Sequence, residues 1–203
     1  MIVFAGLEAL PVSLPCSDAR KKELDKLKNE EVILEKRGAE ALFWLCYARR
    51  FPNARRPFDY PRASLGKPFF PDAGAFHFSL SHTAGFALCA ALSSPCGADI
   101  ERVGRISERV IARFFHEKER ACLASLPEKE RAEAAARVWC LREAYGKRLG
   151  TGLFGLGKEF YVLPSGETSA QGVHLRSFLL TPSLAAAVCA TEEIRDIPEE
   201  IQW

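Results

Sequence analysis

The order of the secondary-structure patterns most constrains this fold, because strand, helices and strands follow one another twice. In the first half the predicted elements are a strand, a pair of helices and two short strands, at residues 2–10, 18–50, 76–80 and 86–92. In the second half they are a strand, three helices and a group of strands, at residues 98–103, 107–115, 116–126, 127–149 and 159–191. This order predicts an α+β fold of two similar halves. No residue-level repeat accompanies it, so a duplication is inferred from the element order alone.

Turn-forming residues predict where these elements end. A Ser-Pro-Cys-Gly turn at 94–97 separates the halves, so we divide the chain into residues 1–96 and 97–203. Gly150 and Gly152 end the longest helix. The proline-rich, basic segment 52–68 predicts an ordered loop, and the polar residues 81–85 predict a turn between two short strands.

Charge and cysteine usage narrow the class of protein. The net charge of the 203 residues is only +2, and five arginines would be the main argument for a nucleic-acid-binding module: Arg49, Arg50, Arg55, Arg56 and Arg62. They lack interleaved aromatic residues, which argues against that module. No window is apolar enough to span a membrane. Seven cysteines without a Cys-x-x-Cys pair predict reduced thiols, and we expect a cytoplasmic protein.

Two acidic residues on one predicted strand give the first suggestion of chemistry. Side chains alternate along a strand, so Asp99 and Glu101 point to one face and Ile100 to the other. Paired carboxylates repel each other unless a cation separates them, and oxygen ligands suit Mg²⁺. The alternative is an edge strand with a solvated acidic face.

A stripe on the longest predicted helix is the second suggestion. Trp139, Glu143 and Lys147 are spaced four residues apart and therefore share one helical face. Alone, this pattern favours a packed aromatic residue followed by a surface ion pair. Ser81 and His82 are adjacent in an extended segment and face opposite sides, so they do not form a nucleophile–base pair. We expect His82 to hold a phosphate or a substrate carbonyl instead.

Four segments in this order resemble the Sfp-type 4′-phosphopantetheinyl transferases. They are Gly-Lys-Pro at 66–68, Phe-Ser-Leu-Ser-His-Thr at 78–83, Gly-Ala-Asp-Ile-Glu at 97–101, and Trp-Cys-Leu-Arg-Glu-Ala-Tyr-Gly-Lys at 139–147 before a glycine-rich end. The resemblance covers roughly residues 28–153. Arg142 departs from the usual lysine, and Glu40 and Ala41 stand where the family often has arginine and a hydroxyl residue. Lys28 could supply a basic contact in place of the one that this change removes.

The resemblance implies a 4′-phosphopantetheinyl transferase fold, a pseudo-twofold pair of α+β halves with the active site in the cleft between them. It implies transfer of phosphopantetheine from coenzyme A to a serine of an apo acyl or peptidyl carrier protein, releasing 3′,5′-ADP. The alternative is a coenzyme A-binding member without transfer activity. Both halves lie on one chain, so we expect a monomer.

The resemblance also assigns roles to residues. Mg²⁺ is expected on Asp99, Glu101 and Glu143, with Glu143 as candidate base and Asp99 and Lys147 in the catalytic group. Coenzyme A phosphates are expected in the first half, on Lys28, Lys67, Ser81, His82 and Thr83, together with Lys147. The second half, through residues 150–156 and a basic patch, is expected to meet the carrier protein; the candidates are Arg131, Arg137 and Arg148.

Overall fold

The computed structural model describes residues 1–8, 10–11, 14–55, 57–70 and 76–203, so Arg56 of the basic loop lies outside the described residues. The helices are α1 (Asp18–Leu24), α2 (Glu30–Arg50), α3 (Glu108–Phe114), α4 (Glu117–Ser125), α5 (Glu128–Leu149) and a short 3-10 helix, η1 (Leu153–Gly155). The strands are β1 (Ile2–Gly6), β2 (His77–Thr83), β3 (Phe86–Leu92), β4 (Cys96–Arg102), β5 (His174–Thr181), β6 (Leu184–Ala190) and β7 (Glu199–Glu200).

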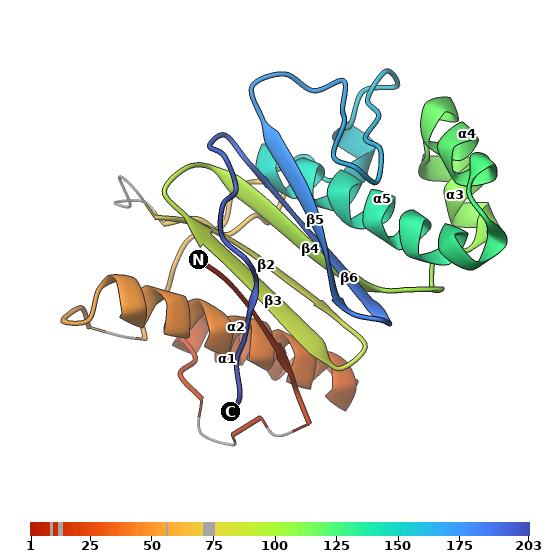
Figure 1. The fold of residues 1–203 in the computed structure, drawn as a ribbon. Helices are drawn as coiled ribbons and strands as arrows, with labels where there is room; N and C mark the ends of the chain where they lie inside the picture. The colour runs from red at the N-terminus through yellow and green to blue at the C-terminus, as the bar shows by residue number, and fades with distance from the viewer. Residues whose placement is uncertain (9, 12–13, 56, 71–75) are drawn as a thin grey trace.

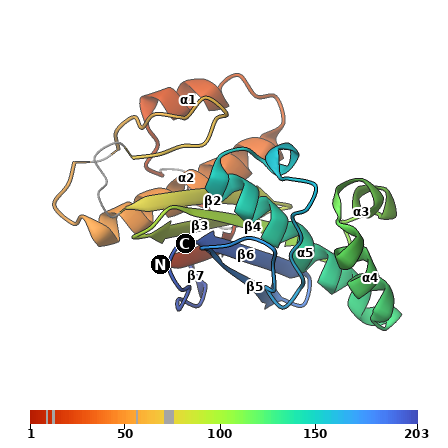
Figure 2. The same ribbon diagram turned by 90° about the horizontal axis from the view of Figure 1, so that it is seen from above.

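The strands form two sheets, with the orders β2-β3-β1-β7 and β4-β6-β5. In each half the first strand pairs antiparallel with the second strand of a later hairpin: β1 with β3, and β4 with β6. A long helix, α2 or α5, belongs to each half and lies on the outer side of its sheet (Figures 1 and 2). The α+β class is confirmed and the connectivity recurs in both halves, whereas a twofold axis relating them stays a prediction.

Successive side chains of a strand point to opposite faces of the sheet. The strands therefore pack against the layers on both sides. On β1, Val3 and Ala5 join the cluster under α2, whereas Ile2 and Phe4 face the second sheet. That inner cluster continues with side chains of the second sheet, among them Ala98, Ile100, Leu184, Ala186 and Val188. Intervening β6 residues pack against α5. The layers are therefore α2, first sheet, second sheet and α5, with one apolar cluster shared by both halves.

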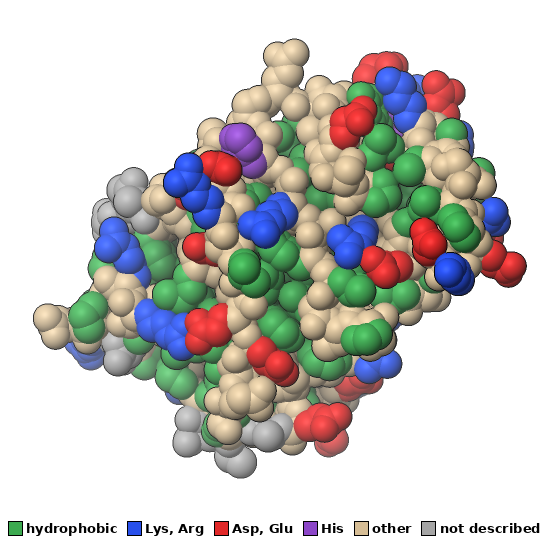
Figure 3. Space-filling model, in the orientation of Figure 1, with side chains coloured by type: hydrophobic (Ala, Val, Ile, Leu, Met, Phe, Trp, Pro, Cys, Tyr) green, Lys and Arg blue, Asp and Glu red, His purple; other side chains and the backbone are tan. Residues whose placement is uncertain are grey.

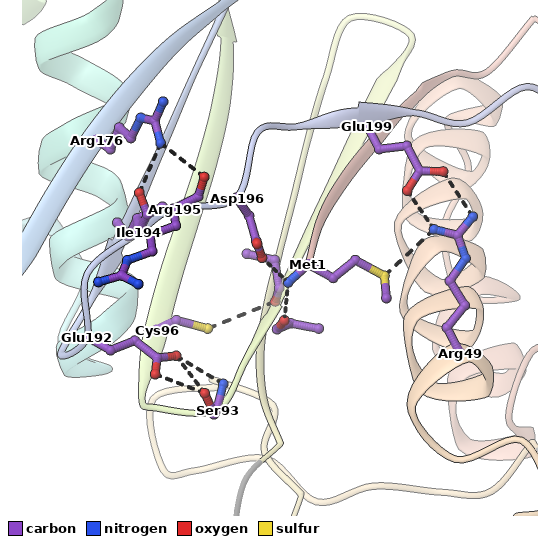
Figure 4. A network of polar contacts seen from close by, with 12 residues as sticks. Met1, Arg49, Ser93, Cys96, Arg176, Glu192, Ile194, Arg195, Asp196 and Glu199 are labelled. Carbon is purple, nitrogen blue, oxygen red and sulfur yellow. Dashed lines mark hydrogen bonds and ion pairs between the residues drawn. The ribbon is translucent and has the colours of Figure 1, made fainter.

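The C-terminal segment returns from the second half to the first. Its strand β7 pairs parallel with β1, and Glu199 accepts two hydrogen bonds from the Arg49 guanidinium, at 2.7 and 3.0 Å (Figure 4). Glu192 accepts a 2.8 Å hydrogen bond from the Ser93 hydroxyl in the same network. This segment was not predicted as a strand, because two residues of pairing leave no periodic pattern in the sequence.

The helices of both halves are confirmed, while several strand predictions need correction. The first strand ends at Gly6 and not at residue 10, and β4 begins at Cys96, inside the turn predicted at 94–97. Residues 81–83 belong to β2 and not to a turn; the turn contains only Ala84 and Gly85, both with positive φ, as a tight hairpin turn requires. Residues 159–173 are mainly irregular, with one isolated bridge between Val162 and Thr168. In the described part of the chain, no cysteine is disulfide-bonded and no helix is long and apolar enough to cross a bilayer.

Candidate active site

Three hydroxyl residues on β2 face the acidic strand β4. Ser79, Ser81 and Thr83 alternate along β2 and therefore point the same way. The Ser79 hydroxyl accepts from the Ala98 amide at 2.9 Å. The Ser81 hydroxyl donates to Asp99 Oδ1 at 2.7 Å, and the Thr83 hydroxyl donates to Glu101 Oε1 at 2.8 Å. The predicted common direction of both acids is thus confirmed, and β2 holds each carboxylate in place.

Gly97 explains how the helix stripe reaches these acids. A Cβ atom at this position would lie 2.0 Å from the carbonyl oxygen of Ala144 and 2.4 Å from the amide nitrogen of Arg148. The backbone of α5 therefore lies directly against β4, an approach that only glycine permits. This contact is the physical reason for a glycine two residues before Asp99.

A pocket of about 450 Å³ brings the predicted catalytic residues together. Its walls include Ser81 and His82 from β2, Asp99 and Glu101 from β4, and Trp139, Glu143 and Lys147 from α5. The stripe predicted from the spacing of four residues therefore faces the acids. Lys147 Nζ donates to Asp99 Oδ1 at 2.6 Å and to the Ser81 hydroxyl at 2.9 Å.

Asp99, Glu101 and Glu143 bring three carboxylates to the walls of this pocket. Among the described residues, no group of three or more His, Cys, Asp or Glu side chains is already arranged to hold a metal ion. Burial, followed by the charge of Asp99, raises the pKa of Glu143; Glu101 adds to this rise and Lys147 opposes it. Their mutual repulsion is what a divalent cation relieves, and carboxylate oxygens are the donors that Mg²⁺ prefers. By donor type the three carboxylates therefore suit Mg²⁺, although their present spacing does not form a metal site.

A second, basic pocket of about 350 Å³ adjoins the first, because both are lined by Leu80, His82 and Lys147. Six side chains that are or can become cationic line it: Arg20, Lys36, Arg62, Lys67, His82 and Lys147. No acidic side chain lines this pocket among the described residues. The sequence motifs missed Arg20 and Lys36, since each lies on a helix outside the four segments. Arg62 lies in the basic loop, where composition gave the only signal.

The predicted phosphate lysines are placed differently from each other. Lys67 lines the basic pocket, but its ammonium donates to the carbonyl oxygens of Cys96 and Arg148, at 3.0 and 2.9 Å. It thereby joins the loop before β2 to the start of β4 and the end of α5. Lys28 is exposed in the turn before α2 and lines neither pocket. A phosphate role for either lysine stays a prediction.

Glu40 is turned away from the basic pocket. Its fully buried carboxylate accepts from Trp44 Nε1 at 2.9 Å and from the Tyr60 hydroxyl at 2.5 Å, with Arg20 Nε 3.9 Å away. Burial raises its pKa. Because Tyr60 lies in the loop that carries Arg62, the hydrogen bond from Tyr60 to Glu40 joins that loop to α2. Ala41 is buried as well.

Arg142 is a buried residue of α5 and precedes Glu143 in the sequence. Its NH1 donates to Glu119 at 2.8 Å and to the carbonyl oxygen of Phe160 at 3.3 Å. Glu119, fully buried, also accepts from the amides of His116 and Val162, at 2.7 and 2.8 Å. The arginine that replaces the family's usual lysine therefore anchors α4 and residues 156–163 to α5.

Comparison with known proteins gives one family. The sequence model of the 4′-phosphopantetheinyl transferase superfamily matches residues 95–192. The 4′-phosphopantetheinyl transferase Sfp of Bacillus subtilis is 27% identical over 76% of this chain and 71% of its own length. The 4′-phosphopantetheinyl transferase ffp of B. subtilis is 31% identical over 67% and 63%, and HetI of Nostoc is 37% identical over 47% and 42%.

The match spans more than two thirds of Sfp but less than two thirds of ffp and HetI. The matched region of the family model contains Gly97, which lies against α5, and Asp99, Glu101, Glu143 and Lys147, which line the β4–α5 side of the pocket. Residues 95–192 of this chain, just under half of its length, therefore match the 4′-phosphopantetheinyl transferase superfamily, and the three relatives named above are 4′-phosphopantetheinyl transferases.

Proposed function

We propose that this protein transfers the phosphopantetheine group of coenzyme A to a serine of an apo acyl or peptidyl carrier protein. One observation carries the proposal: an acidic pocket that fits Mg²⁺ opens into a basic pocket that fits phosphates. A substrate with a diphosphate next to the bond that breaks, and further anionic charge beyond it, suits this order of charges. Coenzyme A has that arrangement.

The basic pocket would hold the nucleotide end of coenzyme A. Arg20, Lys36, Arg62 and His82 surround it, and Lys147 stands where the two pockets meet. Mg²⁺ would be held by Asp99, Glu101 and Glu143, and when bound it would neutralise diphosphate charge. We assign phosphate binding mainly to residues 1–96, and the metal and carrier contacts to residues 97–203.

The transfer requires one proton acceptor and a fixed alignment. The carrier serine oxygen forms a bond to the phosphorus that bears the pantetheine arm, and the bond from that phosphorus to the 3′,5′-ADP oxygen breaks. Glu143 would accept the serine proton, directly or through a water. Lys147 would hold a diphosphate oxygen that gains charge.

The carrier protein would approach beside the acidic pocket. Phe154 of η1 is 81% exposed and packs against Phe114, with Arg113 over both rings. Phe114 in turn packs against Trp139, which lines the acidic pocket, so the surface beside this pocket is apolar and basic, as an acidic partner requires. The arginines predicted for this contact are partly engaged within the chain, since Arg137 donates to Glu133 and Arg131 to the carbonyl oxygen of Leu126.

Mass spectrometry of carrier proteins tests the proposal. Incubation with coenzyme A, MgCl₂ and a panel of apo acyl and peptidyl carriers should add one phosphopantetheine mass to at least one of them. Omission of the metal should abolish this gain. Binding of coenzyme A without a mass gain on any carrier would instead support the alternative, a coenzyme A-binding protein. Lys147→Ala should raise the KM for coenzyme A; an unchanged KM in a folded variant would contradict its phosphate role.

The setting of the reaction follows from the same features. One chain supplies both walls of the cleft, so we propose that the monomer is active. Unpaired cysteines fit a reducing compartment, so we propose the cytoplasm as its place of action.

A further inference from the structure

His82 is bound by a carboxylate that none of the four motifs contains. Its Nδ1 lies 2.9 Å from Oε2 of Glu35, a residue of α2. Glu35 is buried, with 7% of its surface exposed, and its other oxygen accepts from the Gly85 amide at 3.1 Å. The two contacts fix this carboxylate between the helix and the hairpin turn.

The hydrogen-bond roles follow from the chemistry of the pair. A carboxylate only accepts, so Nδ1 of His82 carries a hydrogen and donates it to Glu35. In the neutral ring Nε2 is then an acceptor with no hydrogen. The His82 ring lines both the acidic and the basic pocket, where the oxygen of a fully ionised phosphate also only accepts. A hydrogen bond from Nε2 to a phosphate therefore requires a second proton on the ring.

The charged groups around His82 have opposite effects on the protonation of its ring. On α2, Glu35 favours the charged imidazolium of His82 and Lys36 disfavours it. On α5, Lys147 also disfavours the imidazolium, and Glu143 lines the same pocket as His82. From β4, Asp99 and Glu101 line the same pocket. Arg102 and Arg105 line a neighbouring pocket that also reaches His82. Burial is the largest cause of the lowered pKa of the free ring. A bound phosphate would add negative charge next to the ring and would therefore favour the charged imidazolium.

We propose that Glu35 is a positioning residue that makes His82 a proton-linked contact for a coenzyme A phosphate. On binding, the ring takes one proton from solvent at Nε2, and Nδ1–H stays on Glu35. Glu35 thereby aims Nε2 and stabilises the charged ring, without touching the substrate. The inference rests on the proposed function, since the anion is taken to be coenzyme A.

A double-mutant cycle tests this coupling. The Kd of coenzyme A is measured calorimetrically at pH 6.5, 7.0 and 8.5 for the wild type, Glu35→Gln, His82→Gln and the double variant. Glutamine at 35 keeps an oxygen for the Gly85 amide and removes the charge. Near pH 7.0 we expect Glu35→Gln to weaken binding about tenfold in the wild-type background, and by less than about twofold when His82 is absent.

The pH profile separates this role from a purely structural one. Ionisation of coenzyme A itself contributes equally to all four proteins. The tightening of binding towards pH 6.5 should be largest in the wild type, smaller in Glu35→Gln and smallest in His82→Gln. Glu30→Gln makes the same charge change at an exposed position of α2 and should match the wild type.

The remaining outcomes would contradict either the role of Glu35 or the proposed function. An equal loss from Glu35→Gln in both backgrounds, or a pH profile that all variants share, would overturn the role of Glu35 while leaving the proposed function intact. Wild-type protein that binds no coenzyme A would overturn the proposed function together with this inference.

Discussion

Replacement of Arg142 by methionine should cost about 3 kcal/mol of folding free energy. Removing one partner of a buried ion pair costs about 3–5 kcal/mol, because the other charge is left buried. The lower end applies here, since Glu119 keeps two backbone amide donors, from His116 and Val162. Arg142 also leaves its own Nε buried without a hydrogen-bond partner, so part of its burial cost disappears with it.

Urea titration followed by circular dichroism measures this loss, and thermal melting should show a drop of roughly 6–12 °C for a chain of this size. Arg142→Lys keeps the charge and loses the bond to the Phe160 carbonyl, so about 1 kcal/mol is expected. Arg131→Met, on the exposed part of the same helix, should change stability by less than about 0.5 kcal/mol. A loss below about 1 kcal/mol in Arg142→Met would refute this reasoning.

Three further predictions concern Asp99, Gly97 and Glu40. Asp99→Ala should lower the rate of carrier modification at least about a hundredfold, near 3 kcal/mol of barrier, and near-wild-type turnover in magnesium buffer would reject the metal assignment. Gly97→Ala should destabilise the fold by about 2 kcal/mol or more, because its Cβ would overlap the backbone of α5; an unchanged urea midpoint would contradict that contact. Glu40 has a folded-state pKa raised by burial, so its contribution to stability is complete below the unfolded pKa and is lost as pH rises through the folded value. Glu40→Gln should therefore lose less stability than the wild type between pH 4.5 and 8, and parallel curves would disprove this linkage.

The sequence predicted the parts of this molecule that depend on local period and spacing. Alternation along a strand places Asp99 and Glu101 on one face, and a spacing of four residues aligns Trp139, Glu143 and Lys147; the structure brings both sets to one pocket. The helices were predicted for the same reason, since a long 3.6-residue period is a strong signal.

What the sequence could not predict depends on contacts between distant segments. Arg20 and Lys36 reach the basic pocket only because α1 and α2 pack beside it, and neither carries a local signal. Ser81 and Thr83 are predicted to lie in a turn, whereas they lie on β2 and their hydroxyls donate to acids 18 residues further along the chain. The distribution of charge on the face shown in Figure 3, where basic and acidic side chains alternate among apolar ones, likewise follows from folding.

The apolar cluster that both sheets share determines which parts of the cleft can open. Ile2, Phe4 and Leu88 interlock with Ile100 and their neighbours, so hinge motion between the halves would expose the centre of the protein to water. The floor of the cleft is therefore rigid, and room for a long substrate has to come from the rim. The segments at that rim are the loop that carries Arg62 and Lys67 and the stretch after Gly150. A long substrate would therefore lie between these two segments, which line the basic pocket, while Ser81 and Thr83 of β2 keep the carboxylates of β4 in place.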